Sequence, residues 1–256
     1  MLEESTSSDS YGIRTLDYPK AVVKMHITSP MESKYRIVAC RKEPWTVEFI
    51  ESLERGSWFL DVGANVGSYT LIAVANSLRV CAIEPSIDSA HRLRENLRLN
   101  DWSDRAAIYV GALSDVTGLN FFSPADLRPG YNDHVFGQHK HKLQKRADIY
   151  HTDIIPTLRL DDLMPMLAGD MPVAMKIDVD GGESAVLAGG TQTLKGGRLN
   201  RLMLELGRAG ADGILAALDR DGWRVVRRIG DSGDEGLPDF GKDRFRDMFY
   251  VWLERG

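Results

Sequence analysis

The stretch Phe59-Leu60-Asp61-Val62-Gly63-Ala64-Asn65-Val66-Gly67-Ser68-Tyr69-Thr70 decides the fold. A short apolar run ends in an acid, a turn with two glycines follows, and a helical pattern begins at Ser68. Glycine adopts backbone conformations that other residues avoid, and it lets a ligand approach the main chain closely. This order is typical of the first strand, turn and helix of an α/β sheet that binds a ligand at its carboxyl edge.

The same alternation continues on the C-terminal side of this stretch. A second apolar run ends in Glu84, and helical patterns alternate with further apolar runs until the last strand at 249–253, which we expect to belong to an antiparallel edge pair. Such alternation predicts right-handed βαβ units and a parallel sheet. The expected strands are 80–84, 107–113, 173–179, 199–206 and 223–226, and the expected helices are 68–76, 87–100, 183–194 and 212–219.

Two segments lie outside this alternation. Before it, residues 1–17 have the composition of a flexible lead-in, 21–27 and 35–40 have strand-like patterns, and 43–53 has a helical one. Within it, residues 116–171 carry turn signals and a strand-like alternation at 148–155, with too few large apolar residues for a separate core. We therefore expect one domain over 1–256, with an N-terminal extension at 1–56 and a β-rich insertion at 116–171.

Composition sets only broad limits. The 256 residues are 43% hydrophobic and 27% charged, which excludes collagen-like and largely disordered chains. The net charge of −5 argues against a protein that coats nucleic acid. Two cysteines without a CxxC pair provide neither a disulfide framework nor a zinc site, and the acidic start is unlike a signal peptide. No apolar run approaches the ~20 residues of a membrane span, so we expect a soluble, cytoplasmic protein without a membrane partner.

The glycine turn differs from the dinucleotide fingerprint GxGxxG. Counted from Gly63, the second and third glycines would fall on Asn65 and Ser68, and Asp61 would repel a pyrophosphate. Glu84, in contrast, lies 21 residues after Gly63, close to the spacing of the acid that binds a ribose diol. A ribose-binding acid beside an acidic turn suits a nucleoside without phosphate, and S-adenosylmethionine is such a ligand.

Four segments together resemble a known family. DVGANVGSYT at 61–70, AIEPS at 82–86, GALSD at 111–115 and MKIDVDGGESAVLAGG at 175–190 are similar to the FkbM family of S-adenosylmethionine-dependent methyltransferases. The resemblance spans about 45–206 and departs mildly at Asp180, where the family more often has Glu. It implies a Rossmann-like class I fold, with a mostly parallel seven-stranded sheet and helices on both faces. It also implies O-methylation of hydroxyls on sugars, polyketides or other natural products, with S-adenosylhomocysteine as product.

The resemblance also implies roles for the residues at the strand ends. Glu84 would bind the ribose hydroxyls, and Asp61 and Gly63 would lie near the methionine part of the cofactor. Asp115 would either accept a hydrogen bond from the adenine amino group or cap the next turn. The remaining cofactor positions are Asn65 and Gly67, which support the turn, Pro85 and Ser86, which flank the adenine, and Ala112, Leu113 and Ser114 after the third strand.

Carboxylates at the end of the strand 173–179 are the candidates for catalysis. Methyl transfer to a hydroxyl requires that the oxygen be positioned and its proton accepted. Asp178 is our first choice, also as a cofactor ligand, with Asp180 beside it, whereas Glu183 also suits the first turn of a helix. Lys176 is expected to pair with an acid or to point away. Glu205 is an acid within an apolar strand, which indicates a site residue.

The insertion supplies the other candidates. His134 could act as a general base over the acceptor, with Tyr131 and Asn132 beside it, whereas His139, His141 and His151 are expected at the surface. The insertion is expected to cover the acceptor site. A divalent metal held by Asp178, Asp180 or Glu205 with a histidine is a competing use of these acids, but no tight ligand spacing favours it.

Three other functions remain as alternatives. They are an N-methyltransferase on RNA or protein, a non-catalytic adenosine-binding module, and a nicotinamide dehydrogenase. The net charge and the sequence IDVDG at 177–181 argue against the first, the retained acids against the second, and Asn65 and Ser68 against the third. The expected partner is a small-molecule or glycan acceptor rather than nucleic acid, and a homo-oligomer is compatible with the sequence.

Overall fold

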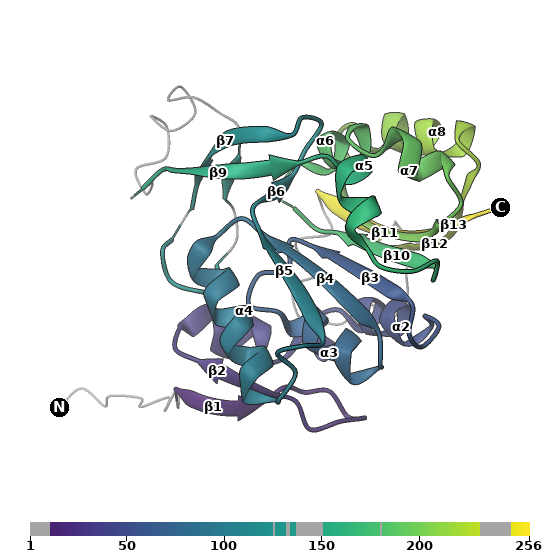
Figure 1. The fold of residues 1–256 in the computed structure, drawn as a ribbon. Helices are drawn as coiled ribbons and strands as arrows, with labels where there is room; N and C mark the ends of the chain where they lie inside the picture. The colour runs from purple at the N-terminus through teal and green to yellow at the C-terminus, as the bar shows by residue number, and fades with distance from the viewer. Residues whose placement is uncertain (1–10, 125, 132–133, 137–150, 180, 231–246) are drawn as a thin grey trace.

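The computed structural model describes residues 11–124, 126–131, 134–136, 151–179, 181–230 and 247–256. Its centre is a seven-stranded sheet in the order β12-β13-β11-β10-β3-β4-β5 (Figure 1). All neighbouring strands are parallel except at β13, which runs antiparallel to both β11 and β12. The strands are β3 (Trp58–Val62), β4 (Arg79–Glu84), β5 (Ala106–Val110), β10 (Val173–Ile177), β11 (Leu199–Gly207), β12 (Trp223–Ile229) and β13 (Met248–Arg255).

This strand order determines where a ligand can bind. The chain runs outward from β3 through β4 to β5, and then returns to place β10 on the other side of β3. The direction of winding therefore reverses between β3 and β10. In open α/β sheets the crevice at such a reversal, beyond the carboxyl ends of the strands, is where ligands bind. The expected α/β architecture is confirmed, and the last strand, β13, forms an antiparallel pair with β12 at the edge of the sheet, as expected.

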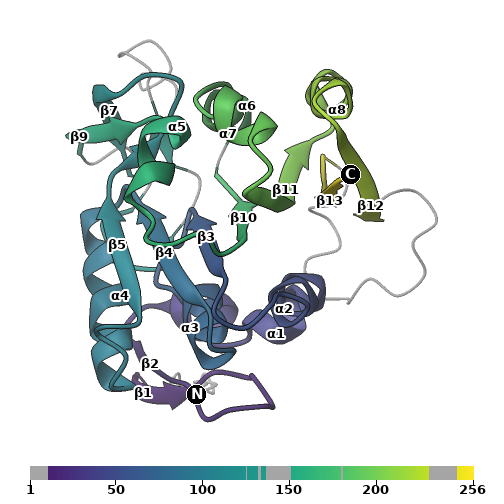
Figure 2. The ribbon, with the colours of Figure 1, turned by 45° about the vertical axis from the view of Figure 1, so that its right-hand side comes forward.

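Helices cover both faces of the sheet (Figures 1 and 2). On one face lie α1 (Ala39–Lys42), α2 (Pro44–Glu51), α3 (Ser68–Ala75) and α4 (Ile87–Leu99). The other face carries α5 (Leu160–Leu163), a short 3-10 helix η3 (Met164–Met166), α6 (Glu183–Ala188), α7 (Thr191–Lys195) and α8 (Ala211–Arg220). The sheet is thus the middle of three layers.

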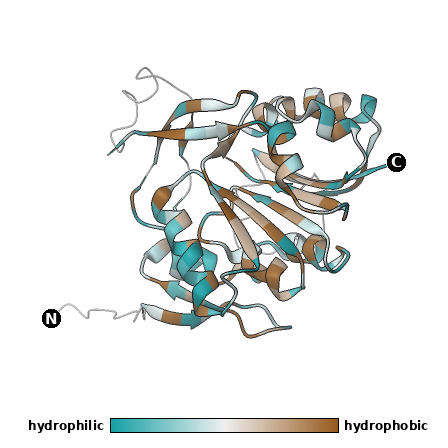
Figure 3. Cartoon of the chain, in the orientation of Figure 1, coloured by the Kyte–Doolittle hydropathy of each residue, from teal (hydrophilic) through white to brown (hydrophobic). Residues whose placement is uncertain are grey.

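Alternation along the strands divides the core into two parts. Phe59 packs with the α1–α4 side, and its neighbour Leu60 packs with the α5–α8 side. Both are fully buried, as expected for a strand covered on both faces. In Figure 3 the central strands are largely apolar, whereas the outer face of α4 is hydrophilic. The α1–α4 face of the sheet is the more important one for the candidate site described below, because the polar side chains of that site lie on this face.

The N-terminal segment differs from expectation. Residues 12–15 form β1 (Gly12–Thr15), which pairs antiparallel with β2 (Lys24–Ile27), although a flexible lead-in was expected there. The expected strand at 35–40 is also wrong, because 32–36 form a π-helix, η1 (Glu32–Arg36), followed by α1. The cause is a capping box: the Ser29 hydroxyl accepts from the Glu32 N–H at 3.1 Å, and Glu32 Oε2 accepts from the N–H groups of Thr28 and Ser29.

The insertion carries a second, smaller sheet in the order β6-β9-β7-β8. Its strands are β6 (Ala112–Leu113), β7 (Gly118–Ser123), β8 (Val135–Phe136) and β9 (Asp153–Leu158). The expected single strand at 107–113 is therefore split at Gly111, where the chain leaves the main sheet. A Cβ at Gly111 would lie 2.5 Å from the carbonyl oxygen of Pro156, so glycine allows β9 to approach.

Two adjacent glycines, Gly189 and Gly190, divide the expected helix 183–194 into α6 and α7. Gly189 approaches the insertion so closely that a Cβ there would lie 2.1 Å from the carbonyl oxygen of Ser114. Its N–H still bonds to the Ala185 carbonyl, and the chain then restarts as a helix at Thr191. The break between α6 and α7 lets this part of the chain pack closely against Ser114, just before the insertion.

Gly63 provides a test of the close backbone contact between the turn after β3 and the end of β10. Its φ is +82°, and an added Cβ would lie 2.0 Å from the backbone oxygen of Asp178. Gly63→Ala is therefore expected to lower the free energy of unfolding in urea by more than about 2 kcal/mol, because the backbone must shift. Gly213→Ala is the control, since nothing lies within 4 Å of its Cβ position and it is within α8; it should stabilise by about 0.5–1 kcal/mol. Equal stabilities of the two variants would contradict this account.

Candidate functional site

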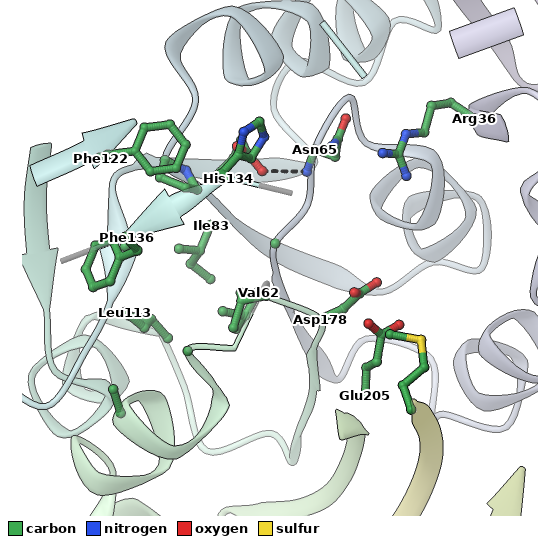
Figure 4. A pocket seen from close by; sticks show the side chains of 18 of the residues that line it. Arg36, Val62, Asn65, Ile83, Leu113, Phe122, His134, Phe136, Asp178 and Glu205 are labelled. Carbon is green, nitrogen blue, oxygen red and sulfur yellow. Dashed lines mark hydrogen bonds between the residues drawn. The ribbon is translucent and has the colours of Figure 1, made fainter. Parts of the chain in front are cut away.

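A cavity of about 580 Å³ opens at the carboxyl ends of β3, β4, β10 and β11 (Figure 4). This volume is typical of a pocket for a small-molecule ligand. Apolar side chains gather at one end of it and polar ones at the other, as Figure 4 shows. The apolar end is lined by Val62, Ile83, Leu113, Phe122 and Phe136, and the polar end by Arg36, Asp178 and Glu205. Tyr35 and Lys42 also line the cavity.

The turn after β3 forms part of the cavity wall. Gly63 and Gly67 have φ of +82° and +92°, and Asn65 has φ of +50°, a conformation that asparagine tolerates better than most residues. The Asn65 side chain holds the turn to the insertion, because its Nδ2 donates to the Tyr131 carbonyl at 2.7 Å. A Cβ at Gly67 would lie 2.1 Å from Leu93 Cδ1, so this glycine allows the turn to pack on α4.

Glu84, the last residue of β4, also lines the cavity. One carboxylate oxygen accepts from the Asn65 N–H at 2.7 Å, and the other accepts from the Ser86 N–H at 2.8 Å. Burial raises the pKa of Glu84 to about 7, although these two hydrogen bonds and the charge of Arg36 lower it in part. Because the folded chain then binds a proton that the unfolded chain loses above pH 4.5, the free energy of unfolding should fall as pH rises from there to about 7.

Lys176 lies below the cavity, on the α1–α4 face of the sheet, with only 1% of its surface exposed. Its ammonium nitrogen lies 3.0 Å from Asp178 Oδ2 and 3.5 Å from Asp61 Oδ1. The register explains both contacts, since Lys176 pairs with Asp61 across β10 and β3, and Asp178 follows two residues later on the same side. The neighbouring carboxylates raise the pKa of Lys176 against the effect of its burial, so it stays charged. Pairing with an acid, one of its two expected arrangements, is what the structure shows.

Asp61 is also held by a hydrogen bond from Thr70. It is fully buried, and its Oδ2 accepts from the Thr70 hydroxyl at 2.7 Å. It does not line the cavity, whereas Asp178, with 30% of its side chain exposed, does. The ion pair with Lys176 thus connects a buried acid to an accessible one.

Glu205, on β11, faces the cavity beside Asp178 (Figure 4). Its cross-strand partner is Tyr250, whose hydroxyl donates to Glu205 Oε2. Burial, followed by the charge of Asp178, raises the pKa of Glu205 well above its ordinary value. Two neighbouring carboxyl groups in such an environment favour a state in which one of them keeps a proton. Glu205 thus lines the cavity, and its role in a functional site stays a prediction.

The expected cofactor positions divide into two groups. Ser86 is the N-cap of α4, with its Oγ accepting from the Ser89 N–H, and Ser114 Oγ donates to Asp115 at 3.0 Å. Those that line the cavity are Gly63, Asn65, Glu84, Pro85, Ala112, Leu113 and Asp178, and those that do not are Asp61, Gly67, Ser86, Ser114 and Asp115.

The residues that were expected to take part in catalysis do not lie together. His134 lines the cavity near its apolar end, with its ring 5.2 Å from that of Phe122, whereas Asp178 lies at the polar end (Figure 4). His151 is exposed and lies 2.8 Å from Asp153 Oδ1. Asp180, Asn132, His139 and His141 lie outside the described residues.

Sequence reasoning missed two groups of cavity residues. Phe122 and Phe136 come from β7 and β8 of the insertion, where only an undivided β-rich segment was expected. Arg36 and Lys42 come from the segment that was expected to be a strand and the start of a helix. The capping box at Ser29 and Glu32 would have indicated a helical turn ending near Arg36, although not that it faces the cavity.

Neither a metal centre nor a membrane span emerges from the described residues. Across these ranges, no three or more His, Cys, Asp or Glu side chains are grouped so that they could hold a metal ion. Among the helices of the same ranges, none has the length and apolar composition needed to cross a membrane.

Comparisons with known proteins identify the class and then the family. The chain is 9% identical to a Clostridium thermocellum protein assigned as an rRNA methylase, with a TM-score of 0.50 over 84% of this chain and 97% of that one. An rRNA methylase of Streptococcus thermophilus is 13% identical, with a TM-score of 0.48 over 82% and 94%. The first of these likenesses, together with the strand order of the main sheet, shows the fold of a Rossmann-like class I methyltransferase.

The family follows from the sequence comparison. Residues 61–219 match the methyltransferase FkbM domain, and the chain belongs to this family of methyltransferases. A relative from Haloferax volcanii, hexuronic acid methyltransferase AglP, is 29% identical over 187 residues, which are 71% of this chain and 69% of the relative. The resemblance inferred from the motifs is thus confirmed, and the protein is a methyltransferase.

Lys176 provides a test of the buried charges. Lys176→Met leaves Asp61 buried without its cation, and it should lower the free energy of unfolding by about 3–5 kcal/mol. Lys195→Met is the control, because Lys195 is 63% exposed and lies 3.6 Å from Asp221; its effect should be below about 1 kcal/mol. Adding Asp61→Asn to Lys176→Met should recover part of the loss. Urea unfolding measures all three variants, and a Lys176→Met variant as stable as Lys195→Met would disprove the pairing.

Proposed function

We propose that the protein is an S-adenosylmethionine-dependent O-methyltransferase that acts on a hydroxyl of a sugar, natural product or other small molecule. The observation that carries this proposal is that Glu84, held by two main-chain N–H groups, lines the same cavity as a group of apolar side chains and the carboxylates Asp178 and Glu205. A ligand that fills this cavity would have an apolar part, groups that hydrogen-bond to a carboxylate, and a cationic part. S-adenosylmethionine has all three parts.

The residues at the apolar end, together with Glu84, fit the adenosine part. Ile83, Leu113 and Phe122 offer apolar surface for a planar base, and Phe122 also contributes a ring face. Glu84 is held by two main-chain N–H groups and keeps further lone pairs for the ribose hydroxyls. The absence of a side chain at Gly63 leaves the main chain open toward the cavity.

The polar end supports the chemistry of the transfer. The cofactor would supply a methyl group on a positively charged sulfur, and its transfer to a hydroxyl releases a proton from that oxygen. Asp178 is the group we assign to accept this proton, because it is accessible and its orientation is fixed by Lys176. Glu205 lies beside it, with Tyr250 on its other side. We assign no proton transfer to His134, since it lies toward the apolar end.

A sugar acceptor is favoured by one relative. The Haloferax volcanii relative is a hexuronic acid methyltransferase that aligns with most of this chain. The rRNA methylases share only the fold at their low identity, so they give no support for an RNA acceptor. The net charge of −5 also favours a glycan or small molecule over nucleic acid.

Titration with S-adenosylhomocysteine tests the cofactor. The wild-type protein should bind it, and Glu84→Ala should weaken the binding by about 1–3 kcal/mol because the ribose loses a charged acceptor. Since the pKa of Glu84 is raised to about 7, the wild-type affinity should increase severalfold as pH rises through 7, whereas Glu84→Gln should show no such step. Glu54→Gln, at an exposed position, is the control. A folded wild-type protein that does not bind S-adenosylhomocysteine at any pH would refute the proposal.

Transfer of a labelled methyl group tests the reaction. We expect incorporation into oligosaccharides that contain hexuronic acid, and none into tRNA or peptides. Asp178→Asn should lower kcat by about 10²–10⁴ with a smaller effect on S-adenosylhomocysteine affinity, because proton acceptance is lost. His134→Gln should lower kcat by less than about tenfold, and Asp212→Asn, which is exposed on α8, should leave it unchanged. If His134→Gln abolishes transfer while Asp178→Asn does not, the assignment of Asp178 fails.

A further inference from the structure

Arg36 brings a guanidinium group to the polar end of the cavity (Figure 4). It is the last residue of η1 and precedes the family match, which begins at residue 61. Its Nε donates to the Gly130 carbonyl at 2.8 Å, and its own carbonyl accepts from the Ser68 hydroxyl at 2.9 Å. The side chain is therefore held by the insertion and the main chain by the start of α3, so the position of the guanidinium is fixed before a ligand arrives.

The charge of Arg36 has no carboxylate partner within the described ranges. Its two terminal nitrogens also make no hydrogen bond to any residue described. The two lysines of the site differ in this respect, since Lys42 lies 2.6 Å from Glu43 and Lys176 lies 3.0 Å from Asp178. A half-buried guanidinium whose planar fork faces a cavity is suited to bind an anion through two parallel hydrogen bonds.

The surroundings restrict the kind of anion. Among the described lining residues, Glu84, Asp178 and Glu205 are carboxyl groups, so a doubly charged phosphate at Arg36 would be repelled by several of them. A singly charged, planar carboxylate matches both the charge and the fork.

We infer that Arg36 binds the carboxylate of a ligand in this cavity. The inference rests on the proposed function, which offers two sources of that group. One is the methionine part of the cofactor, and the other is a hexuronic acid in the acceptor. In both cases the guanidinium forms two charge-assisted hydrogen bonds to one carboxylate, while the carboxyl groups of Asp178 and Glu205 stay available to other parts of the ligand.

Two pairs of probes distinguish these sources. S-adenosylhomocysteine and 5′-methylthioadenosine share the adenosine and the sulfur, but only the first has a carboxylate. Glucuronate and glucose form the second pair, titrated with the protein saturated with S-adenosylhomocysteine and again without it. Arg36→Met is compared with Arg36→Lys, which keeps the charge but lacks the fork, and with Arg41→Met, in the same extension and 76% exposed.

Arg36→Met should weaken the binding of one carboxylate-bearing probe by about ten- to hundredfold, with an intermediate loss in Arg36→Lys and none in Arg41→Met. Loss for S-adenosylhomocysteine assigns the cofactor carboxylate, and loss for glucuronate assigns the acceptor. Unchanged binding of 5′-methylthioadenosine or glucose shows that the variant has kept its fold.

Two results would overturn the inference: a wild-type protein without preference for the carboxylate-bearing member of either pair, or an Arg36→Met variant that retains the preference. Failure of the proposed function would look different, because the wild-type protein would then bind neither adenosine compound, and the glucuronate pair measured without S-adenosylhomocysteine would still decide the role of Arg36.

Discussion

The ammonium of Lys176, buried between Asp61 and Asp178, is the interaction on which the site depends. Removing this charge from water is unfavourable, and the two carboxylates, with the centroid of the Tyr69 ring 5.3 Å from the ammonium, make its burial tolerable. The carboxylates come from the two strands between which the winding of the sheet reverses. The same ion pair therefore stabilises the central strand pair and fixes the direction of a carboxylate at the cavity. A change to any of the three charged residues should affect both stability and activity.

Strand register explains why similar acids have different surroundings. Asp61 pairs with Ala82 and with Lys176, so it lies one step below the end of the strands. The next position on the same side of each strand is Gly63 after β3, Glu84 at the end of β4, Asp178 after β10 and Glu205 on β11. These four residues all line the cavity, whereas Asp61 does not. A shift of two residues along a strand, about 7 Å, thus separates a structural acid from those that face a ligand.

Much of this arrangement could be predicted from the sequence, because it depends on local periodicity. Apolar runs with an acid at or next to their end predicted β3, which carries Asp61 one residue before its end, and β4, which ends at Glu84. Parallel strands bring such ends to one edge. The residues from the extension and the insertion could not be predicted in this way. Arg36 reaches the cavity through the capped turn at Ser29 and a contact with Gly130, 94 residues away in the sequence. Phe122 reaches it through strand pairing within the insertion. Such long-range contacts leave no periodic pattern.

The N-terminal extension completes the cavity, and it does so with positive charge. The carboxyl edge of the sheet contributes Glu84, Asp178 and Glu205, whereas η1 and α1 contribute Arg36 and Lys42. The two sets face one cavity from different elements, so the polar end offers acids for a cation and a guanidinium for a carboxylate. A ligand that carries both charges would be oriented by this separation, because reversing it would place each charge beside its like. The position of the extension would therefore set the direction in which such a ligand binds, while the sheet determines the chemistry.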